Sequence, residues 1–344
     1  MYKICTQCVM DTSDTDISFV GGVCNHCTEY VSKEEARKAE IWNLPLLYAK
    51  IREWGKGKKY DVLLGLSGGV DSSLCLHFLV KNGIRPLTYS IDNGWNDPKA
   101  DENIMRMVEK LKVPFYRQTI DLKEFRELQS AFLKSGTKNQ EIPTDHILMA
   151  STYAMAEKYG IKYVISGGNL ATESIMPRSW GYQAKDLTFI KAIYRRFTGK
   201  TFKNIPMISL PKYLYFRFVK GIEIINLLDY YDYNREGAKR LLESEYEWKD
   251  YGEKHCESTF TWWFQNFYLF TKWDIDKRRA HYSSLILSGQ MTRQEALDKL
   301  TESPIYPELG IEKKALSYSK HDYKEFKNSE WVWNLMSRIY SKIK

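Results

Sequence analysis

A seven-residue loop between a predicted strand and a predicted helix limits the fold of this chain more than any other feature. The residues of the loop are Ser67, Gly68, Gly69, Val70, Asp71, Ser72 and Ser73. The apolar run 60–66 predicts a buried strand before it, and the apolar residues within 71–82, closed by Gly83, predict a helix after it. Paired glycines let backbone N–H groups turn inward around phosphate oxygens, and the helix adds the positive end of its dipole. The loop therefore predicts a phosphate site at the carboxyl end of a buried strand.

The side chains of this loop narrow its chemistry further. Its serines add hydroxyl donors for phosphate oxygens, whereas Asp71 would either hold the loop in shape or ligate magnesium. The loop lacks the lysine of the Walker A motif, so its sequence excludes that class of nucleotide-binding loop.

Strands and helices alternate after the loop. Further strands are predicted at residues 86–92, 113–120 and 162–166, with helices at residues 98–111, 121–133 and 145–159. This alternation predicts an α/β fold with a doubly wound, mainly parallel sheet, whose ligands bind beyond the carboxyl ends of the strands. The candidates at that edge are Asp92 and Asn93 after the second strand, and Gly167, Gly168 and Asn169 after the fourth.

The alternation weakens beyond residue 170. Residues 205–210 and 222–228 are predicted as two further strands, and the chain from about residue 234 onward is predicted to be mainly helical. The predicted units are an N-terminal unit (1–30), a charged helical linker (31–59), the α/β domain (60–230, with a basic aromatic insertion at about 170–204) and a mainly helical C-terminal region (231–344).

Four cysteines define the N-terminal unit: Cys5, Cys8, Cys24 and Cys27. They form two C-x2-C pairs separated by fifteen residues, which is the spacing of a zinc ribbon. Gly21 and Gly22 stand just before the second pair, where a tight turn requires them. Four thiolates fill a tetrahedral zinc ion, so a structural zinc site is predicted.

The seven-residue loop resembles the pyrophosphate-binding loop of the PP-loop ATP pyrophosphatases, a superfamily with a HUP-like α/β fold. The resemblance implies cleavage of ATP between its α- and β-phosphates, transfer of AMP to a substrate oxygen, and magnesium as a cofactor. It also implies that Asp92 and Asn93 approach the adenine or ribose. On the other side of the nucleotide, it implies contacts from Gly167, Gly168 and Asn169.

Longer stretches resemble the N-acetyl sugar amidotransferases of bacterial surface-polysaccharide and O-antigen synthesis. They are residues 5–13 (CTQCVMDTS), 251–261 (YGEKHCESTFT), 276–281 (DKRRAH) and 285–292 (LILSGQMT). The resemblance implies that the acetamido group of an activated N-acetyl sugar is adenylated and converted by ammonia to an acetamidino group. Lys254, His255 and Glu257 are the candidates for orienting the substrate or moving protons, unless they form a charged cluster on a helix surface.

Two other functions fit parts of the sequence. A tRNA-thiolating PP-loop enzyme usually needs cysteines beyond its zinc ligands, and only Cys75 and Cys256 remain. Cys75 lies between two leucines and is predicted to be a buried thiol. The other alternative is a non-catalytic zinc-ribbon subunit that docks a glutaminase.

The source of ammonia is predicted to be another protein. Residue 2 is a tyrosine, so there is no N-terminal cysteine nucleophile, and neither Cys75 nor Cys256 stands in a glycine-flanked turn. The resemblance likewise implies a separate glutaminase subunit, with a cyclase-like subunit that channels ammonia as a further partner.

The charge of the chain favours anionic partners. Lysine and arginine number 51 against 43 acidic residues, a net charge of +8. Residues 188–221 hold eight Lys/Arg, eight Phe/Tyr and no acid, which fits a solvated basic face over packed aromatics, phosphosugar or partner docking, or a peripheral membrane contact. Nucleic acid is the least favoured partner because no RNA-binding module is present. Without an apolar export signal or a long apolar stretch, a cytoplasmic location is predicted.

Overall fold

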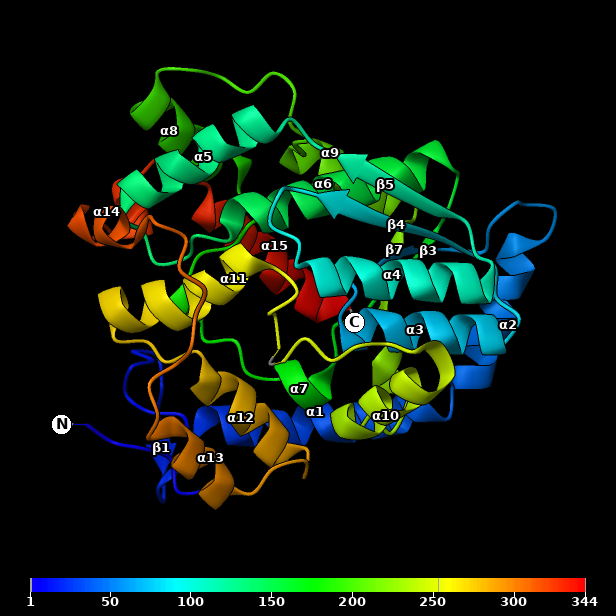
Figure 1. Ribbon diagram of the computed structural model, residues 1–344, viewed down its shortest axis with the longest axis horizontal. Helices are drawn as coiled ribbons and strands as arrows, with labels where there is room; N and C mark the ends of the chain where they lie inside the picture. The colour runs from blue at the N-terminus through cyan, green and yellow to red at the C-terminus, as the bar shows by residue number, and fades with distance from the viewer. Residues whose placement is uncertain (1, 253, 344) are drawn as a thin grey trace.

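A five-stranded parallel sheet forms the centre of the fold (Figure 1). The computed structural model describes residues 2–252 and 254–343, so Glu253, within the stretch 251–261, lies outside the described residues. In spatial order the strands are β5 (Phe115–Thr119), β4 (Pro86–Asp92), β3 (Val62–Gly65), β6 (Tyr163–Ser166) and β7 (Glu223–Asn226). Because β3, β4 and β6 are apolar runs buried on both faces, they fit a parallel sheet covered by helices on each side.

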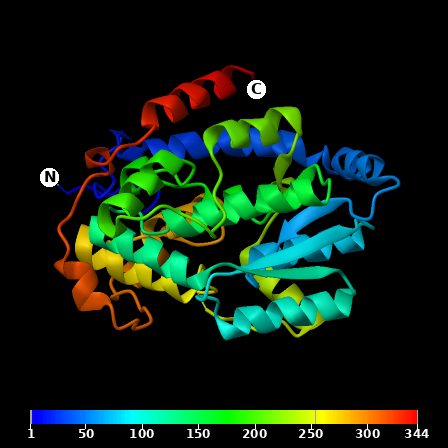
Figure 2. The same ribbon diagram turned by 90° about the horizontal axis from the view of Figure 1, so that it is seen from above.

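Helices pack on both faces of this sheet, as Figure 2 shows. Leu63 and Val164 face one core, and their neighbours Val62 and Ile165 face the other. The first core is formed with α5 (Leu122–Ser135), α6 (Ile142–Lys158) and α8 (Leu187–Thr198). The second is formed with α2 (Leu44–Gly55), α3 (Val70–Lys81), α4 (Pro98–Leu111) and α10 (Arg235–Tyr246). The predicted doubly wound α/β fold is confirmed.

The strand order changes direction at β3. From β3 the sheet extends through β4 to β5 on one side and through β6 to β7 on the other. The loops that follow β3 and β6 therefore leave adjacent strands at the same edge and diverge to different helices. A crevice opens at such a point in doubly wound sheets and takes the ligand.

The N-terminal unit is a small hairpin followed by a long helix. The strands β1 (Phe19–Val20) and β2 (Val23–Cys24) pair antiparallel, and Gly21 and Gly22 turn between them with φ of +58° and +87°. Both φ values suit glycine. The helix α1 (Asn25–Ile41) begins directly after β2, so the predicted boundary after residue 30 falls inside a helix.

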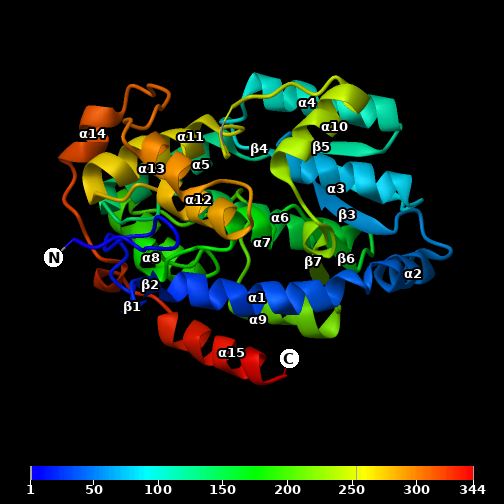
Figure 3. The ribbon, with the colours of Figure 1, turned by 90° about the horizontal axis from the view of Figure 1, so that it is seen from below.

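The C-terminal region is mainly helical, as predicted. It contains α11 (Thr259–Trp263), the π-helix η4 (Phe264–Lys272), α12 (Arg278–Leu287), α13 (Arg293–Leu300), α14 (Glu312–Ser317), η5 (Tyr323–Glu325) and α15 (Glu330–Ile343). Phe260 and Trp263 share a buried cluster with the four cysteines of the N-terminal unit. Figure 3 shows the N-terminal end of the chain beside α12 and α13.

One predicted strand is wrong. Residues 205–209 form a loop rather than a strand, and Leu210 is the first residue of a helix. The amides of Lys203, Asn204 and Ile205 donate to the carboxylate of Glu124 at 2.7, 2.7 and 2.9 Å, so they are not available to a neighbouring strand. Pro206 has no amide hydrogen to contribute. Residues 222–228 are partly extended, as β7, and continue into the 3-10 helix η3 (Leu227–Tyr230).

The basic aromatic stretch 188–221 packs most of its rings and exposes most of its charges, although Tyr215 and Phe218 are exposed. It includes most of α8 and all of α9 (Leu210–Leu214) and the π-helix η2 (Tyr215–Val219). Phe189, Tyr194 and Phe216 are buried, whereas Lys191 and Arg195 are exposed. This arrangement fits a solvated basic face. Within the described residues, no helix combines the length and the apolar character needed to cross a membrane.

Candidate active site

The four predicted zinc ligands converge on one point. Their Sγ atoms all lie within 4.8 Å of one another, with separations of 3.8 Å (Cys5–Cys27), 3.7 Å (Cys8–Cys24) and 3.6 Å (Cys24–Cys27). A tetrahedral zinc ion with Zn–S bonds of about 2.3 Å separates its sulfurs by about 3.8 Å. The backbone amides of Gln7, Cys8 and Cys24 also point at Cys5 Sγ. The cluster fits a closed structural zinc site.

The N-terminal zinc ribbon (residues 1–30) forms hydrogen bonds with two other parts of the chain. Arg293 of α13 donates to the carbonyl oxygens of Cys8 and Cys5 at 3.0 and 2.9 Å. On the other side, Ser179 Oγ donates to Asp14 Oδ1 at 2.6 Å, and Trp180 Nε1 donates to the Ser13 carbonyl at 3.2 Å. These two residues belong to the 3-10 helix η1 (Arg178–Trp180). The ribbon therefore holds η1 in place.

The seven-residue loop has the shape expected of a phosphate cradle. Gly68 has a φ of +77°, and a Cβ at this position would lie 2.0 Å from the Ala100 carbonyl oxygen. Gly69 is the N-cap of α3, and its amide donates to Ser67 Oγ at 3.2 Å. The Ser67 and Ser72 hydroxyls are 3.2 Å apart, and the buried Ser73 is already within the helix. The chain can turn sharply here because Gly68 has a positive φ and packs closely against Ala100. Other residues tolerate both conditions poorly.

Gly68→Ala is therefore expected to weaken ATP binding at least tenfold, because the loop must move away from Ala100. Gly83→Ala is the matched control: Gly83 has a similar φ of +69°, but nothing lies within 4 Å of the added methyl group. Both variants carry the cost of a left-handed residue, about 1–2 kcal/mol. ATP affinity by calorimetry should fall only for Gly68→Ala. Equal effects of the two substitutions would show that crowding at Gly68 is unimportant.

The two predicted glycine loops touch each other. A Cβ on Gly167 would lie 3.0 Å from the Ser72 amide nitrogen and 3.1 Å from Asp71 Cβ, and Gly168 follows it. Asn169 caps the short helix α7 (Leu170–Glu173), since its Oδ1 accepts from the Thr172 amide at 2.9 Å. The glycine-containing loops after β3 and β6 are thus in contact at this edge of the sheet.

The residues at the end of β4 lie on the other side of the loop. Asn93 and Ser90 line the adjoining cleft, and the buried Ser90 Oγ has no hydrogen-bond partner among the described residues. Asp92 Oδ1 accepts from the Gly94 amide at 3.0 Å and closes a turn. Of the two residues predicted to approach the adenine or ribose, Asn93 lines the cleft and Asp92 does not, and the unpaired Ser90 hydroxyl is a further candidate for that contact.

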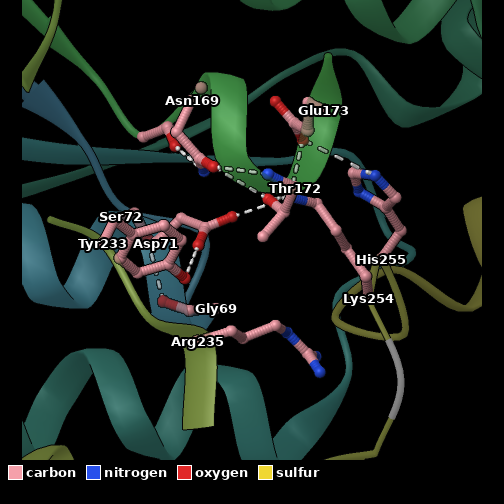
Figure 4. Close-up of polar contacts among 12 residues, drawn as sticks. Gly69, Asp71, Ser72, Asn169, Thr172, Glu173, Tyr233, Arg235, Lys254 and His255 are labelled. Atoms are coloured by element: carbon pink, nitrogen blue, oxygen red, sulfur yellow. Dashed lines mark hydrogen bonds and ion pairs between the residues drawn. The ribbon is translucent and has the colours of Figure 1, made fainter. Parts of the chain in front are cut away.

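A network of charges surrounds Asp71 (Figure 4). Lys254 Nζ lies 2.9 Å from Asp71 Oδ2, 3.0 Å from Glu173 Oε1 and 2.6 Å from Thr172 Oγ1. The Tyr233 hydroxyl donates to the other oxygen of Asp71. Burial lowers the pKa of Lys254, but the two carboxylates outweigh it and raise the pKa above its usual value, so the lysine stays charged.

The carboxylates of this network fit magnesium. Asp71 and Glu173 flank one cation, the Lys254 ammonium, and carboxylate oxygens are the ligands that Mg²⁺ prefers. Asp71 was a candidate ligand from the sequence, whereas Glu173 was not identified. The sequence contains one indication of Glu173, because this residue lies in the first turn of the short helix that Asn169 caps.

His255 and Glu257 border the same network. Burial, followed by the charges of Lys254 and Lys277, lowers the pKa of His255 to about 3, so its ring is neutral at physiological pH. Burial raises the pKa of Glu257 to about 7. Glu257 Oε2 is buried and has no hydrogen-bond partner among the described residues. Of these two candidates, Glu257 is the one whose proton exchanges near neutral pH.

A segment of the C-terminal region covers the phosphate loop. Trp248 Nε1 donates to the Gly68 carbonyl at 3.1 Å, and the Tyr251 hydroxyl accepts from the Val70 amide. A Cβ on Gly69 would lie 2.9 Å from the Tyr251 hydroxyl. The free amides at the start of α3 are the donors expected to bind phosphate oxygens. Tyr251 therefore occupies a position that a phosphate oxygen would take.

Tyr251→Phe is accordingly expected to tighten ATP binding by up to about tenfold, because the nucleotide no longer competes with a hydrogen bond worth about 0.5–1.5 kcal/mol. Tyr246→Phe is the control, since Tyr246 bonds His77 at 2.6 Å instead of the loop. Calorimetric titration with ATP measures both. Weaker binding by Tyr251→Phe would instead make Tyr251 a phosphate ligand.

A large cleft of about 1680 Å³ begins at this network. Its wall includes Ser67 of the loop, Ser90 of β4, Glu257, Lys277 and Trp180. Small-molecule sites in proteins usually measure about 300–1,000 Å³. The cleft is therefore large enough for ATP together with a second substrate. Cys75 and Cys256 are buried and do not line the cleft, and burial raises the pKa of the Cys75 thiol well above its usual value.

Comparison with known proteins identifies the C-terminal part of the chain. Residues 257–342 match the family described as LPS biosynthesis protein WbpG-like, C-terminal domain, which confirms the predicted resemblance to proteins of surface-polysaccharide synthesis for this region. No curated protein matches the chain.

Two solved structures share its general arrangement. An NMN synthetase from Francisella tularensis is 13% identical over 75% of this chain and 91% of that chain, with a TM-score of 0.37. An NH3-dependent NAD synthetase from Campylobacter jejuni subsp. jejuni NCTC 11168, in complex with the nitrate ion, is 17% identical over 78% of this chain and 99% of that chain, with a TM-score of 0.31. These TM-scores are low, and we base no functional conclusion on them.

Proposed function

We propose that this chain, which carries a WbpG-like C-terminal domain over residues 257–342, is an ATP-dependent amidotransferase acting on an activated N-acetyl sugar. The reaction would convert the acetamido group of the sugar to an acetamidino group. One observation carries the proposal: Glu257, the first residue of the matched domain, reaches to within 3.4 Å of a Cβ placed on Gly69 and lines the large cleft. The domain associated with polysaccharide synthesis thus contributes directly to the phosphate loop.

The first step would be adenylation of the amide oxygen. That oxygen attacks the α-phosphorus of ATP, a P–O bond forms, and the bond to the bridging oxygen breaks as pyrophosphate leaves. The amides at the start of α3 and the loop hydroxyls would stabilise the charge that gathers on the leaving group. Magnesium, held by Asp71 and Glu173, would neutralise part of the same charge when bound. Lys254 lies between these carboxylates, and its ammonium group would stay in contact with the pyrophosphate as it leaves.

The second step would be attack by ammonia on the adenylated carbon. A C–N bond forms, and the C–O bond breaks as AMP leaves with the former amide oxygen. One proton must leave the attacking nitrogen, because the amidinium product keeps only two of its hydrogens. With a pKa of about 7 and a carboxylate oxygen that has no hydrogen-bond partner among the described residues, Glu257 is suited to accept it. His255 remains neutral and would orient the substrate.

The activity of Glu257→Gln tests this assignment. Since only the ionised carboxylate accepts a proton, kcat of the unmodified protein should fall as pH drops through about 7, the pKa of Glu257. Glu257→Gln should lower kcat by about 10²–10⁴-fold and abolish this acid limb. Glu141→Gln is the control, because Glu141 is a second buried carboxyl of the cleft wall whose pKa burial raises to about 8. If Glu257→Gln keeps the limb, another group is the base.

Ammonia would come from a separate glutaminase subunit, with a cyclase-like subunit channelling it. Neither Cys75 nor Cys256, the two cysteines outside the zinc cluster, lines the cleft. The purified chain is therefore expected to form product with ammonium salts and not with glutamine. AMP release measured with each nitrogen source distinguishes them. Glutamine-driven turnover by the single chain would refute the need for a partner.

The decisive experiment is a screen of nucleotide-activated N-acetyl sugars with ATP and ammonium. Exchange of oxygen for NH lowers the product mass by about one unit and adds a base. AMP and pyrophosphate should form together with that product. AMP release that depends on tRNA would support a thiolating enzyme instead. Absence of pyrophosphate release with every sugar, with partner and ammonia supplied, would support a docking subunit.

A further inference from the structure

A small pocket of about 50 Å³ lies behind the charge network, beside the large cleft. Four cationic side chains line it, and none of its lining residues is acidic. Gln265 and His281 add polar groups to the wall. The four cations are Arg235, Lys254, Lys277 and Arg278. A concave site with this charge attracts an anion.

Two of these cations have no ion pair shorter than 3.9 Å with another described residue. The ammonium group of Lys277 makes no hydrogen bond or ion pair with another described residue, and it lies 5.5 Å from the centroid of the Trp180 ring. The guanidinium of Arg235 makes a hydrogen bond of 3.4 Å to the Gly252 carbonyl and an ion pair of 3.9 Å to the exposed Glu236. Burial lowers the pKa of Lys277 to about 8 and outweighs the carboxylates of Glu173 and Asp145, which act in the opposite direction.

The pocket adjoins both parts of the proposed reaction centre. Thr172 and Lys254 connect it to Asp71 of the phosphate loop, and Lys254 Nζ is 2.6 Å from Thr172 Oγ1. Lys277, His281 and Gln265 line the pocket and the large cleft alike. An anion in the pocket would therefore contact the loop network on one side and the cleft on the other.

We propose that this pocket is a second phosphate site, distinct from the cradle formed by residues 67–73. A guanidinium, an ammonium and side-chain amide donors converge on a space too small for a nucleotide, which suits a single phosphate group. The phosphate would have one of two sources, both resting on the proposed function. It is either the departing pyrophosphate or the phosphate that links the sugar to its carrier.

Binding of inorganic pyrophosphate tests the site without requiring turnover. The full-length chain with magnesium should bind two equivalents in a calorimetric titration, one at the loop and one in the pocket. Lys277→Met should lose the second equivalent or weaken it at least tenfold, and Lys277→Arg should keep it. Lys313→Met removes an exposed charge on α14 and should also keep it. A single equivalent in the unmodified chain, or two unchanged equivalents in Lys277→Met, overturns the proposal.

A second variant protects the test against misfolding. Gln265→Glu has almost the same size and adds a negative charge to the pocket, so it should weaken the second equivalent as Lys277→Met does. ATP binding to the loop should stay within about twofold of the unmodified value in both variants, which shows that the fold is intact. A variant that binds neither ATP nor pyrophosphate has lost its fold, and the other variant then decides.

Steady-state kinetics then distinguish the two sources. If the pocket holds the phosphate of the sugar carrier, Lys277→Met raises KM for the activated sugar and leaves inhibition by pyrophosphate unchanged. If it holds departing pyrophosphate, the inhibition constant for pyrophosphate rises and KM for the sugar does not. If neither changes, the pocket plays no part in the reaction and the proposal is wrong. Should no sugar be turned over, the binding stoichiometry still decides whether the site exists.

Discussion

Replacing Cys5 by serine is expected to remove zinc from the N-terminal unit and to unfold it. The Cys5 sulfur is 3.8 Å from Cys27 Sγ and accepts three backbone amides, from Gln7, Cys8 and Cys24. A serine hydroxyl is a poor zinc ligand at neutral pH and cannot replace a thiolate. A structural zinc ion contributes on the order of 10 kcal/mol to a small unit, more than the cysteine hairpin gains from its few buried residues.

The loss of zinc should also disturb the wall of the large cleft. The ribbon holds Ser179 through Asp14 at 2.6 Å and Trp180 through Ser13 at 3.2 Å, and both residues line the cleft. The phosphate loop makes its own contacts with Trp248 and Tyr251 instead. Cys5→Ser is therefore expected to raise KM for the sugar at least tenfold and to change ATP affinity much less.

Metal analysis, thermal unfolding and ATP calorimetry on the same preparation measure these effects. Cys75→Ser is the control, because Cys75 is an equally buried thiol outside the cluster and its loss should leave the zinc content unchanged. A chain with Cys5→Ser that keeps one zinc per molecule would contradict the assignment of ligands. So would an intact fold of the unmodified protein without bound metal.

The features predicted correctly from the sequence are those that depend on local order. Runs such as residues 86–92 and 98–111 carry their own periodicity, so β4 and α4 begin and end where the pattern places them. The cysteine pairs and the glycine loops are likewise encoded within a few residues. Residues 205–210 have an apolar pattern too, but three amides in and before this run bond Glu124, which is about 80 residues away. No local rule predicts such a contact.

The contacts of the site that the sequence missed join residues from distant elements. Asp71 meets Lys254 across 183 positions of the chain and Tyr233 across 162. Glu173 joins Lys254 from α7, and Arg235 opens α10, without any motif that sets either residue apart. The choice between His255 and Glu257 as proton acceptor likewise depends on burial and on neighbouring charges. These are properties of the folded chain and appear only in its structure.

Among the substitutions that affect adenylation, Asp71→Asn has the largest expected effect. The carboxylate of Asp71 accepts from Tyr233, pairs with Lys254 at 2.9 Å and is a candidate magnesium ligand at the start of α3. Asparagine has nearly the same shape but no charge. Adenylation should slow by on the order of 10²–10³-fold, because the developing charge of the leaving pyrophosphate loses its organised metal and lysine. The magnesium concentration for half-maximal rate should rise at least tenfold.

Pyrophosphate release at several magnesium concentrations measures both effects. Asp101→Asn is the matched control, because Asp101 of α4 makes an ion pair of 2.9 Å with Arg117 of β5 and does not line the cleft. It should leave rate and magnesium dependence within about twofold of the unmodified values. Undiminished adenylation by Asp71→Asn, with its fold confirmed by thermal unfolding, would exclude Asp71 from the reaction.

Combining Asp71→Asn with Lys254→Met separates the roles of the two residues. If Lys254 acts only as the counter-ion of Asp71, removing both charges should cost no more than removing Asp71 alone. If Lys254 also binds the departing pyrophosphate, the double variant should be slower than Asp71→Asn by about another tenfold or more, because that contact exists only in the reacting complex. We expect the second result, since Glu173, 3.0 Å away, can hold Lys254 near the loop after Asp71 is neutralised.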